Sequence, residues 1–103
     1  MTIPFQYSQQ QIDLRIAPIG EHVRNAALAA AVTLTRPTTA RRLTIVAETQ
    51  NVRIRFDGNA ATATTGFPLT AGVNYCLDID PGVVSVSVIE TAASAVINYQ
   101  WMG

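Results

Sequence analysis

The sequence predicts an all-β fold: a single antiparallel β-sandwich, jelly-roll-like or Ig-like, with about seven or eight short strands over residues 12–103. Three observations predict it. Apolar and polar residues alternate over several short segments, which is the period of strands with one buried face. Turn residues separate these segments at intervals of roughly 10–15 residues, a spacing typical of sandwiches. The chain has 103 residues, enough for one hydrophobic core and too few for two.

The first third of the chain gives the weakest strand pattern. Residues 1–11 have no sustained period and include a polar, uncharged run, which predicts an N-terminal arm. Apolar residues alternate with charged ones over 12–16 and predict a first strand, which the Pro-Ile-Gly of 18–20 should close. Residues 21–26 contain good helix formers and predict a turn or short helix, whereas 28–36 turns to β-type sequence and predicts a strand ended by proline.

The rest of the chain shows clearer alternation. Residues 42–48 and 52–56 predict two strands joined by a tight turn, so we expect a hairpin over 42–56 with Glu48 paired across the turn to Arg53. The Pro-Gly at 81–82 is a strong turn signal. Further strand segments are expected at 67–69, 73–80, 84–88 and 95–101.

Composition limits the classes of partner. Only 14% of residues are charged and the formal net charge is zero, so the surface has little protection against self-association, and we expect a homo-oligomer or a partly covered surface. Seven arginines balance seven acidic residues, which argues against nucleic acid as a partner. No apolar run is long enough to predict a membrane span, and the start of the chain lacks the pattern of a signal peptide. We therefore expect synthesis in a cytoplasm without standard secretion.

No catalytic residue, metal ligand set or cofactor site is predicted. Asp78 and Asp80 share one face of a predicted strand and could bind Ca²⁺ or act as an acid–base pair, but the Pro-Gly turn that follows favours a turn role. His22 and Cys76 are the only residues of their types, so neither a zinc site nor an internal disulfide is expected. Cys76 is expected to be a small buried hydrophobe.

Serine nucleophiles are not expected either. Ser85 and Ser87 lie between valines without a Gly-x-Ser-x-Gly context, and we expect both on the exposed face of their strand. Near the C-terminus, Tyr99 and Trp101 fall on one face of the last strand. They are expected to fill the core, the alternative being an aromatic platform of the kind found in sugar-binding modules.

The segment after residue 52 is the best candidate for binding. Arg53, Arg55 and Asp57 form a charged row that either docks a partner or keeps a sheet edge soluble. The loop 57–66 is rich in Ala and Thr, and such small residues either let its backbone lie flat against another surface or mark an ordinary surface loop. Candidate interface residues, with those of the arm, are Phe5, Tyr7, Gln9, Arg53, Arg55, Asp57, Asn59, Thr62 and Thr64.

Residues 41–101 also carry a resemblance. An apolar strand is followed by Arg-x-Asp-Gly, a Thr/Ala-rich loop with Ala-Thr-x-x-Gly, an Ala-Gly turn, a Val/Ile strand and an alternating strand that ends in Tyr and an aromatic residue. These elements stand at 43–47, 55–58, 63–66, 71–72, 83–89 and 95–101, with the apolar 67–69 between loop and turn. In this order they resemble small structural proteins encoded in the morphogenesis regions of tailed bacteriophages. One departure is Ala61, where the pattern has proline.

The resemblance implies a non-enzymatic β-sandwich component of the virion and transfers no active-site residues. Foremost it implies a head decoration (cement) protein on the capsid exterior, which binds across major capsid subunits and stabilises the head by added contact area. A tail or neck adaptor, or the base of a fibre, is the alternative on the same particle, with another virion protein as partner. From the residues alone, a carbohydrate-binding module with Tyr75, Tyr99 or Trp101 stacking on sugar is the other alternative.

Overall fold

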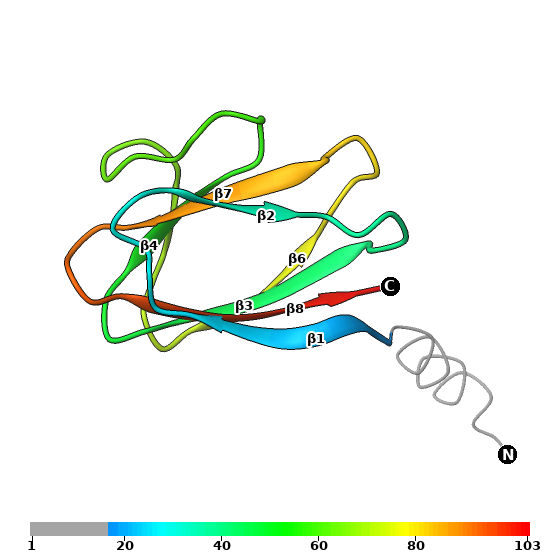
Figure 1. Cartoon of the computed structure of the whole chain (residues 1–103), viewed down its shortest axis with the longest axis horizontal. Coiled ribbons are helices and arrows are strands. Elements are labelled where there is room, and N and C mark those ends of the chain that lie inside the picture. Colours follow the sequence, from blue (N-terminus) through cyan, green and yellow to red (C-terminus); the bar gives the residue numbers. More distant parts are fainter. Residues whose placement is uncertain (1–16) are drawn as a thin grey trace, which may run out of the picture.

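The computed structural model describes residues 17–103 and shows a two-layered β-sandwich (Figure 1). Within that range there are eight strands and no helix, and the strands form two four-stranded antiparallel sheets. The prediction of an all-β sandwich is confirmed. The strands are β1 (Pro18–Asn25), β2 (Val32–Thr35), β3 (Arg42–Glu48), β4 (Val52–Arg55), β5 (Phe67–Leu69), β6 (Asn74–Asp78), β7 (Ser85–Glu90) and β8 (Val96–Met102).

The strand order decides between the two topologies that the sequence left open. Sheet A has the order β1-β8-β3-β6 and sheet B the order β2-β7-β4-β5. This is the order of a jelly roll, in which two Greek keys fold over each other and most successive strands change sheet. An Ig-like sandwich would group the strands differently. Figure 1 shows β2 and β7 in one layer and β1, β8 and β3 in the other.

Alternation along the strands builds the core between the sheets. Leu43, Ile45 and Ala47 of β3 are buried, while the residues between them are only partly covered. Val52 and Ile54 of β4 face them from the other sheet and are fully buried. Each strand therefore contributes one apolar face, as a period of two requires. The remaining core members include Leu28, Leu34, Leu69, Ile79, Val86, Val88, Ile97 and Trp101.

The predicted hairpin over 42–56 is wrong. Its two strands exist, but β3 pairs with β6 and β8 in sheet A, and β4 pairs with β5 and β7 in sheet B. The connection 49–51, with Thr49 at a φ of 67°, crosses from one sheet to the other. Glu48 consequently does not meet Arg53; it accepts a hydrogen bond from Asn98 and lies 3.6 Å from Arg24. Alternation fixes which face of a strand is buried, but it is the same for a hairpin as for two strands facing across a core.

The predicted turn or helix at 21–26 is also wrong. Residues 21–25 belong to β1, an edge strand that begins at Pro18, inside the expected stop at 18–20, and has a register shift between Ile19 and Val23. Pairing with β8 places Ile19 opposite Trp101 and Val23 opposite Tyr99, so tertiary pairing overrides the helix propensity of this segment. The strand β2 falls inside the predicted 28–36. The predicted strand at 12–16 and the arm at 1–11 lie outside the described residues.

Two predictions of side-chain burial need correction. Cys76 is exposed, because it shares the outward face of β6 with Asn74 and Asp78. Ser87 is only 7% exposed although it faces away from the core of the sandwich. The cover over Ser87 is the loop 57–66, described next.

Candidate interaction surface

The loop 57–66 folds back over the outer face of sheet B. Ser87 lies on that face, since its cross-strand partners are Thr33 and Arg55 and not the buried Ile54. The backbone N–H of Ala61 donates a hydrogen bond to Ser87 Oγ over 2.9 Å, and both residues are buried there. This bond explains why a serine stands between two valines: its hydroxyl accepts the buried N–H of Ala61 in the loop.

Two arginines of β4 hold the loop by donating hydrogen bonds to its backbone carbonyls. Arg53 donates from Nε to the carbonyl of Ala63 over 3.0 Å and from Nη1 to that of Gly66 over 2.7 Å. Arg55 reaches the carbonyl of Ala60 over 3.4 Å. Guanidinium groups suit this task because they present several donors in a fixed plane. The charged row predicted for the wet face of β4 is therefore largely occupied by its own loop.

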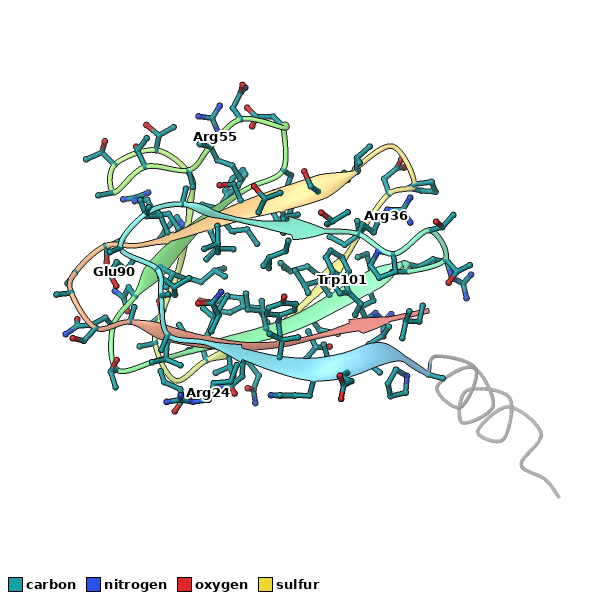
Figure 2. The ribbon with its side chains drawn as sticks, viewed as in Figure 1. Arg24, Arg36, Arg55, Glu90 and Trp101 are labelled. Carbon is teal, nitrogen blue, oxygen red and sulfur yellow. The ribbon has the colours of Figure 1, made fainter. Side chains whose placement is uncertain are left out.

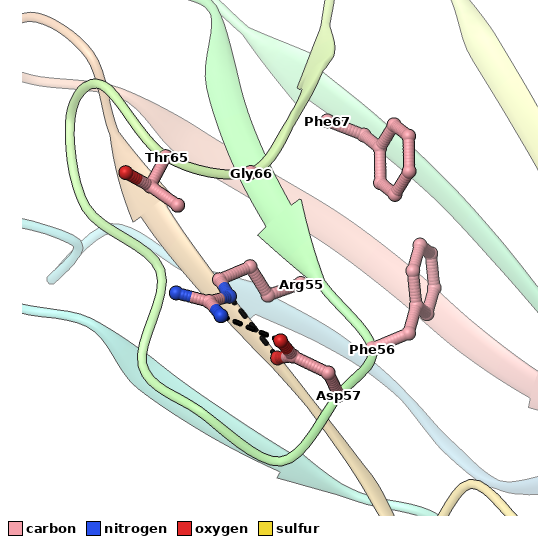
Figure 3. Close-up of a pocket in the computed structure, with 6 residues that line it drawn as sticks. All are labelled: Arg55, Phe56, Asp57, Thr65, Gly66 and Phe67. Atoms are coloured by element: carbon pink, nitrogen blue, oxygen red, sulfur yellow. Dashed lines mark hydrogen bonds and ion pairs between the residues drawn. The ribbon is translucent and has the colours of Figure 1, made fainter.

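Arg55 and Asp57 form a forked ion pair at the start of the loop (Figure 3). Arg55 Nε and Nη2 donate to the two carboxylate oxygens over 3.0 and 2.5 Å. The N–H of Asn59 donates to the same carboxylate over 3.2 Å, an Asx-type turn. The bonds from Arg55, and then from Asn59, hold the pKa of Asp57 well below its ordinary value.

The tip of the loop is a small closed turn with no charge. Thr62 and Thr65 exchange backbone hydrogen bonds over 3.0 and 3.2 Å. Thr62 Oγ1 also accepts from the N–H groups of Thr64 and Thr65. The exposed side chains at the tip include Asn59, Thr62 and Thr64, which are predicted interface residues. The tip thus presents amide and hydroxyl groups to solvent on a backbone whose conformation is set by internal bonds.

Beside the loop lies an open depression with a volume of about 470 Å³. Its lining residues are Arg55, Phe56, Asp57, Thr65, Gly66 and Phe67 (Figure 3). The rings of Phe56 and Phe67 lie with centroids 6.0 Å apart and planes tilted by 45°. Phe67 is 66% exposed, the largest aromatic exposure in the described chain. The sequence pattern indicates Phe67 only as the start of a strand and does not predict this exposed apolar surface.

The structure gathers six of the nine predicted interface residues into one unit formed by β4 and its following loop. They are Arg53, Arg55, Asp57, Asn59, Thr62 and Thr64. The other three, Phe5, Tyr7 and Gln9, lie outside the described residues. The predicted interface does not include Ser87, Phe56 or Phe67, which also belong to this unit. Of these, only Ser87 stands out in the sequence, as a serine between two valines.

The other groups weighed for chemistry are separately engaged. Asp78 pairs with Arg42 over 3.1 Å, and Asp80 Oδ1 accepts the N–H of Gly82 over 2.7 Å, the turn role that the sequence favoured. His22 Nε2 lies 3.2 Å from Asn98 Oδ1. Over residues 17–103, no three His, Cys, Asp or Glu side chains gather in a way that suits a metal ion. The same stretch contains no helix with the length and hydrophobicity to cross a membrane.

The C-terminal aromatic residues fill the core, as predicted. Trp101 is 6% exposed and points between the two sheets (Figure 2), and Tyr99 packs against the same cluster. A sugar-stacking platform built on Trp101 is therefore not present. Tyr75 is half-buried, and its hydroxyl accepts the N–H of Thr70 over 2.9 Å.

Comparison with protein-family models, with curated proteins and with solved structures finds no match to this chain. Its function is therefore inferred from the strand order, the tethered loop and the resemblance of residues 41–101.

Proposed function

We propose that this protein is a virion structural protein of a tailed bacteriophage that acts by binding, foremost as a decoration protein on the outside of the head. The observation that carries the proposal is the arginine-tethered loop 57–66. It lies within the segment that resembles phage morphogenesis proteins, and it presents a preformed neutral surface. A jelly roll is also an architecture of viral coat proteins, although lectins and cupins share it.

The built-in order of the loop favours binding. Loops that become fixed only in the complex lose conformational entropy at that moment, which weakens association. Here the hydrogen bonds that Arg53 donates and the one that Ser87 accepts fix the backbone of the loop in advance. The exposed Asn59, Thr62 and Thr64 offer hydrogen bonds without any charge to desolvate, so they can lie against a capsid surface at little cost.

The proposed mechanism is added contact area across neighbouring major capsid subunits. A stable protein interface buries roughly 1,600 Å² in total, about 800 Å² from each partner. The protein has an accessible surface of 6276 Å², several times that share, so one face of the sandwich can supply it. The arm residues Phe5, Tyr7 and Gln9 are proposed to extend the same contact.

Mass spectrometry of purified particles, with stoichiometry, tests the assignment. A copy number close to that of the major capsid protein supports decoration of the head. A copy number that matches a single ring of subunits would assign the protein to the neck or tail, as an adaptor or fibre base. Absence from purified particles overturns the proposal.

A matched pair of variants tests the surface. Thr64→Arg places a bulky charge at the exposed loop tip and is expected to reduce occupancy on particles at least several-fold. Thr39→Arg makes the same change at an exposed threonine of the connection between β2 and β3 and should leave occupancy unchanged. Equal occupancy for both variants would exclude the loop tip from the contact.

A further inference from the structure

The sheet edges differ in how they are protected against pairing. β5 carries Pro68, and β1 has a register shift; both features obstruct the addition of a strand. β2 has only four residues before Arg36 and Pro37. β6 has five residues with neither proline nor a register shift, and its pairing with β3 is regular throughout. In the described part of the chain, β6 is thus the edge most open to another strand.

The hydrogen-bond pattern shows which backbone groups of β6 are free. The N–H of Ile79 donates to the carbonyl of Arg41 over 2.8 Å at the end of the ladder between β3 and β6. In an antiparallel pair, alternate residues point their backbone groups at the partner strand. Counting back from Ile79, the backbone groups of Asp78, Cys76 and Asn74 point away from β3, toward the open edge.

An apolar side chain beside this edge also lacks cover. Phe67 pairs with Ile54, which is fully buried, so Phe67 faces the inside of the sandwich. It is nevertheless 66% exposed. β5 and β6 are edge strands of opposite sheets and are joined directly by residues 70–73, so they border the same side of the sandwich. Among residues 17–103, sheet A has no strand beyond β6 that could lie opposite Phe67.

Residues 12–16 have the sequence pattern of a strand that would fit beside β6. Their sequence, Ile-Asp-Leu-Arg-Ile, alternates apolar and charged residues over five positions, the length of β6. Beside β6, Ile12, Leu14 and Ile16 would lie on the inner face, along with Tyr75 and Leu77, and cover Phe67. Asp13 and Arg15 would then lie on the outer face, where Arg15 comes within cross-strand reach of Asp78.

This strand cannot come from the same chain. Residue 16 is bonded to Ala17, and Ala17 exchanges two backbone hydrogen bonds of 3.0 Å with Gly103, next to β8. β6 lies three strands away from β1 in sheet A, which is about 14 Å at the usual strand spacing. Five residues that start at Ala17 cannot lie alongside a strand at that distance. The segment that fits the edge belongs to a second copy.

We infer that residues 12–16 of one copy add as a strand to the open edge of β6 in a neighbouring copy. Backbone bonds to Asn74, Cys76 and Asp78 supply the pairing, and the three apolar side chains supply burial over Phe67. The inference goes beyond virion attachment, because it concerns contact between copies of this chain and applies in free solution.

Cross-linking to the native Cys76 tests which side chains of the added strand point outward. Cys76 points outward on β6, as residues 13 and 15 would on the added strand, and neighbouring strands bring such pairs within disulfide reach. Under mild oxidation, Asp13→Cys or Arg15→Cys should give a covalent dimer, whereas Leu14→Cys should stay at the wild-type background. Adding Cys76→Ser should abolish the dimer. Cross-linking from position 14 as strong as from 13 and 15, or from none of them, overturns the inference.

Light scattering after size exclusion tests the assembly itself. The wild-type chain is expected to be larger than a monomer, and Leu14→Asp should reduce it to a monomer with an unchanged circular dichroism spectrum. Gln10→Asp adds the same charge outside the strand pattern and should keep the assembly. A monomeric wild type, or an assembly that survives Leu14→Asp, overturns the inference.

Discussion

Arginine is the residue that does most to fix the loops of this protein. Arg36 donates five hydrogen bonds to backbone carbonyls and so joins the connection between β2 and β3 to the turn before β7 (Figure 2). The acceptors are the carbonyls of Pro37, Thr38, Ala40, Pro81 and Val83. Arg53 likewise donates hydrogen bonds to two backbone carbonyls of the loop 57–66. The chain has little charge overall, yet the guanidinium groups of these arginines hold its loops in place through hydrogen bonds to backbone carbonyls.

Replacing Arg36 tests that role. Arg36→Ala leaves several partly buried carbonyls without donors and is expected to lower the free energy of unfolding by about 2–4 kcal/mol. Arg36→Lys keeps the charge but not the planar fork, so most of the loss should remain. Chemical denaturation of both variants measures the effect. A lysine variant as stable as wild type would show that charge alone, and not the five-carbonyl geometry, stabilises this end of the sandwich.

The ion pair of Arg55 with Asp57 makes a prediction about pH. The pKa of Asp57 is held low, first by Arg55 and then by Asn59, so the carboxylate stabilises the loop at pH values above the ordinary aspartate pKa of about 3.9. That stabilisation is lost progressively as the pH falls below this value and through the lowered pKa of Asp57. NMR titration should find the Asp57 midpoint below that of a free aspartate, and Arg55→Ala should return it most of the way. An Asp57 pKa unaffected by Arg55→Ala would contradict the pairing.

At the scale of elements, the sequence predicts strands better than it predicts their partners. The bounds expected for β3 and β5 are those observed, because alternation records which side of each strand is buried. The partner of a strand is set by the whole topology, and nothing within 42–56 distinguishes a hairpin from a crossing between sheets. In the same way, helix formers at 21–26 were outweighed by pairing to β8.

The candidate site was located from the sequence, but its internal chemistry was not. Charge and small side chains indicate the six candidate residues between Arg53 and Thr64, and these residues lie together on β4 and the loop that follows it. The role of Arg53 differs from the prediction, because its guanidinium binds carbonyls 10 and 13 residues further along the chain. The exposed Phe67 depends on which sheet each strand joins, and local pattern does not contain that information.

Gly66 provides a test of how tightly the loop closes on β4. Its φ is +136°, and a Cβ there would lie 3.1 Å from both Arg53 Cβ and the carbonyl oxygen of Ile54. Gly66→Ala is therefore expected to cost about 2–3 kcal/mol, from backbone strain and the clash together. The control is Gly72→Ala, also at positive φ but with open space around it, which should cost about 1 kcal/mol. Equal losses in thermal unfolding would mean that the close approach at Gly66 is not a stability determinant.

At the scale of the whole molecule, the jelly roll is built almost entirely from distant pairings. Of the six strand pairs in the described chain, only β4 with β5 joins successive strands. β1 pairs with β8, across nearly the full described length. Each such pair requires a long loop to close before its hydrogen bonds form, which costs entropy early in folding.

We therefore expect slow, cooperative folding, with relaxation times in the range of milliseconds to seconds, roughly as for other sandwiches of high contact order. Trp101 is the only tryptophan. It lies in the core on β8, the strand that pairs with both β1 and β3, so its fluorescence reports formation of sheet A. In stopped-flow refolding, the Trp101 signal and far-ultraviolet circular dichroism should change at one common rate, since neither sheet can bury its apolar face without the other. A Trp101 phase faster than a millisecond would show that Trp101 becomes buried before the distant pairings of sheet A form.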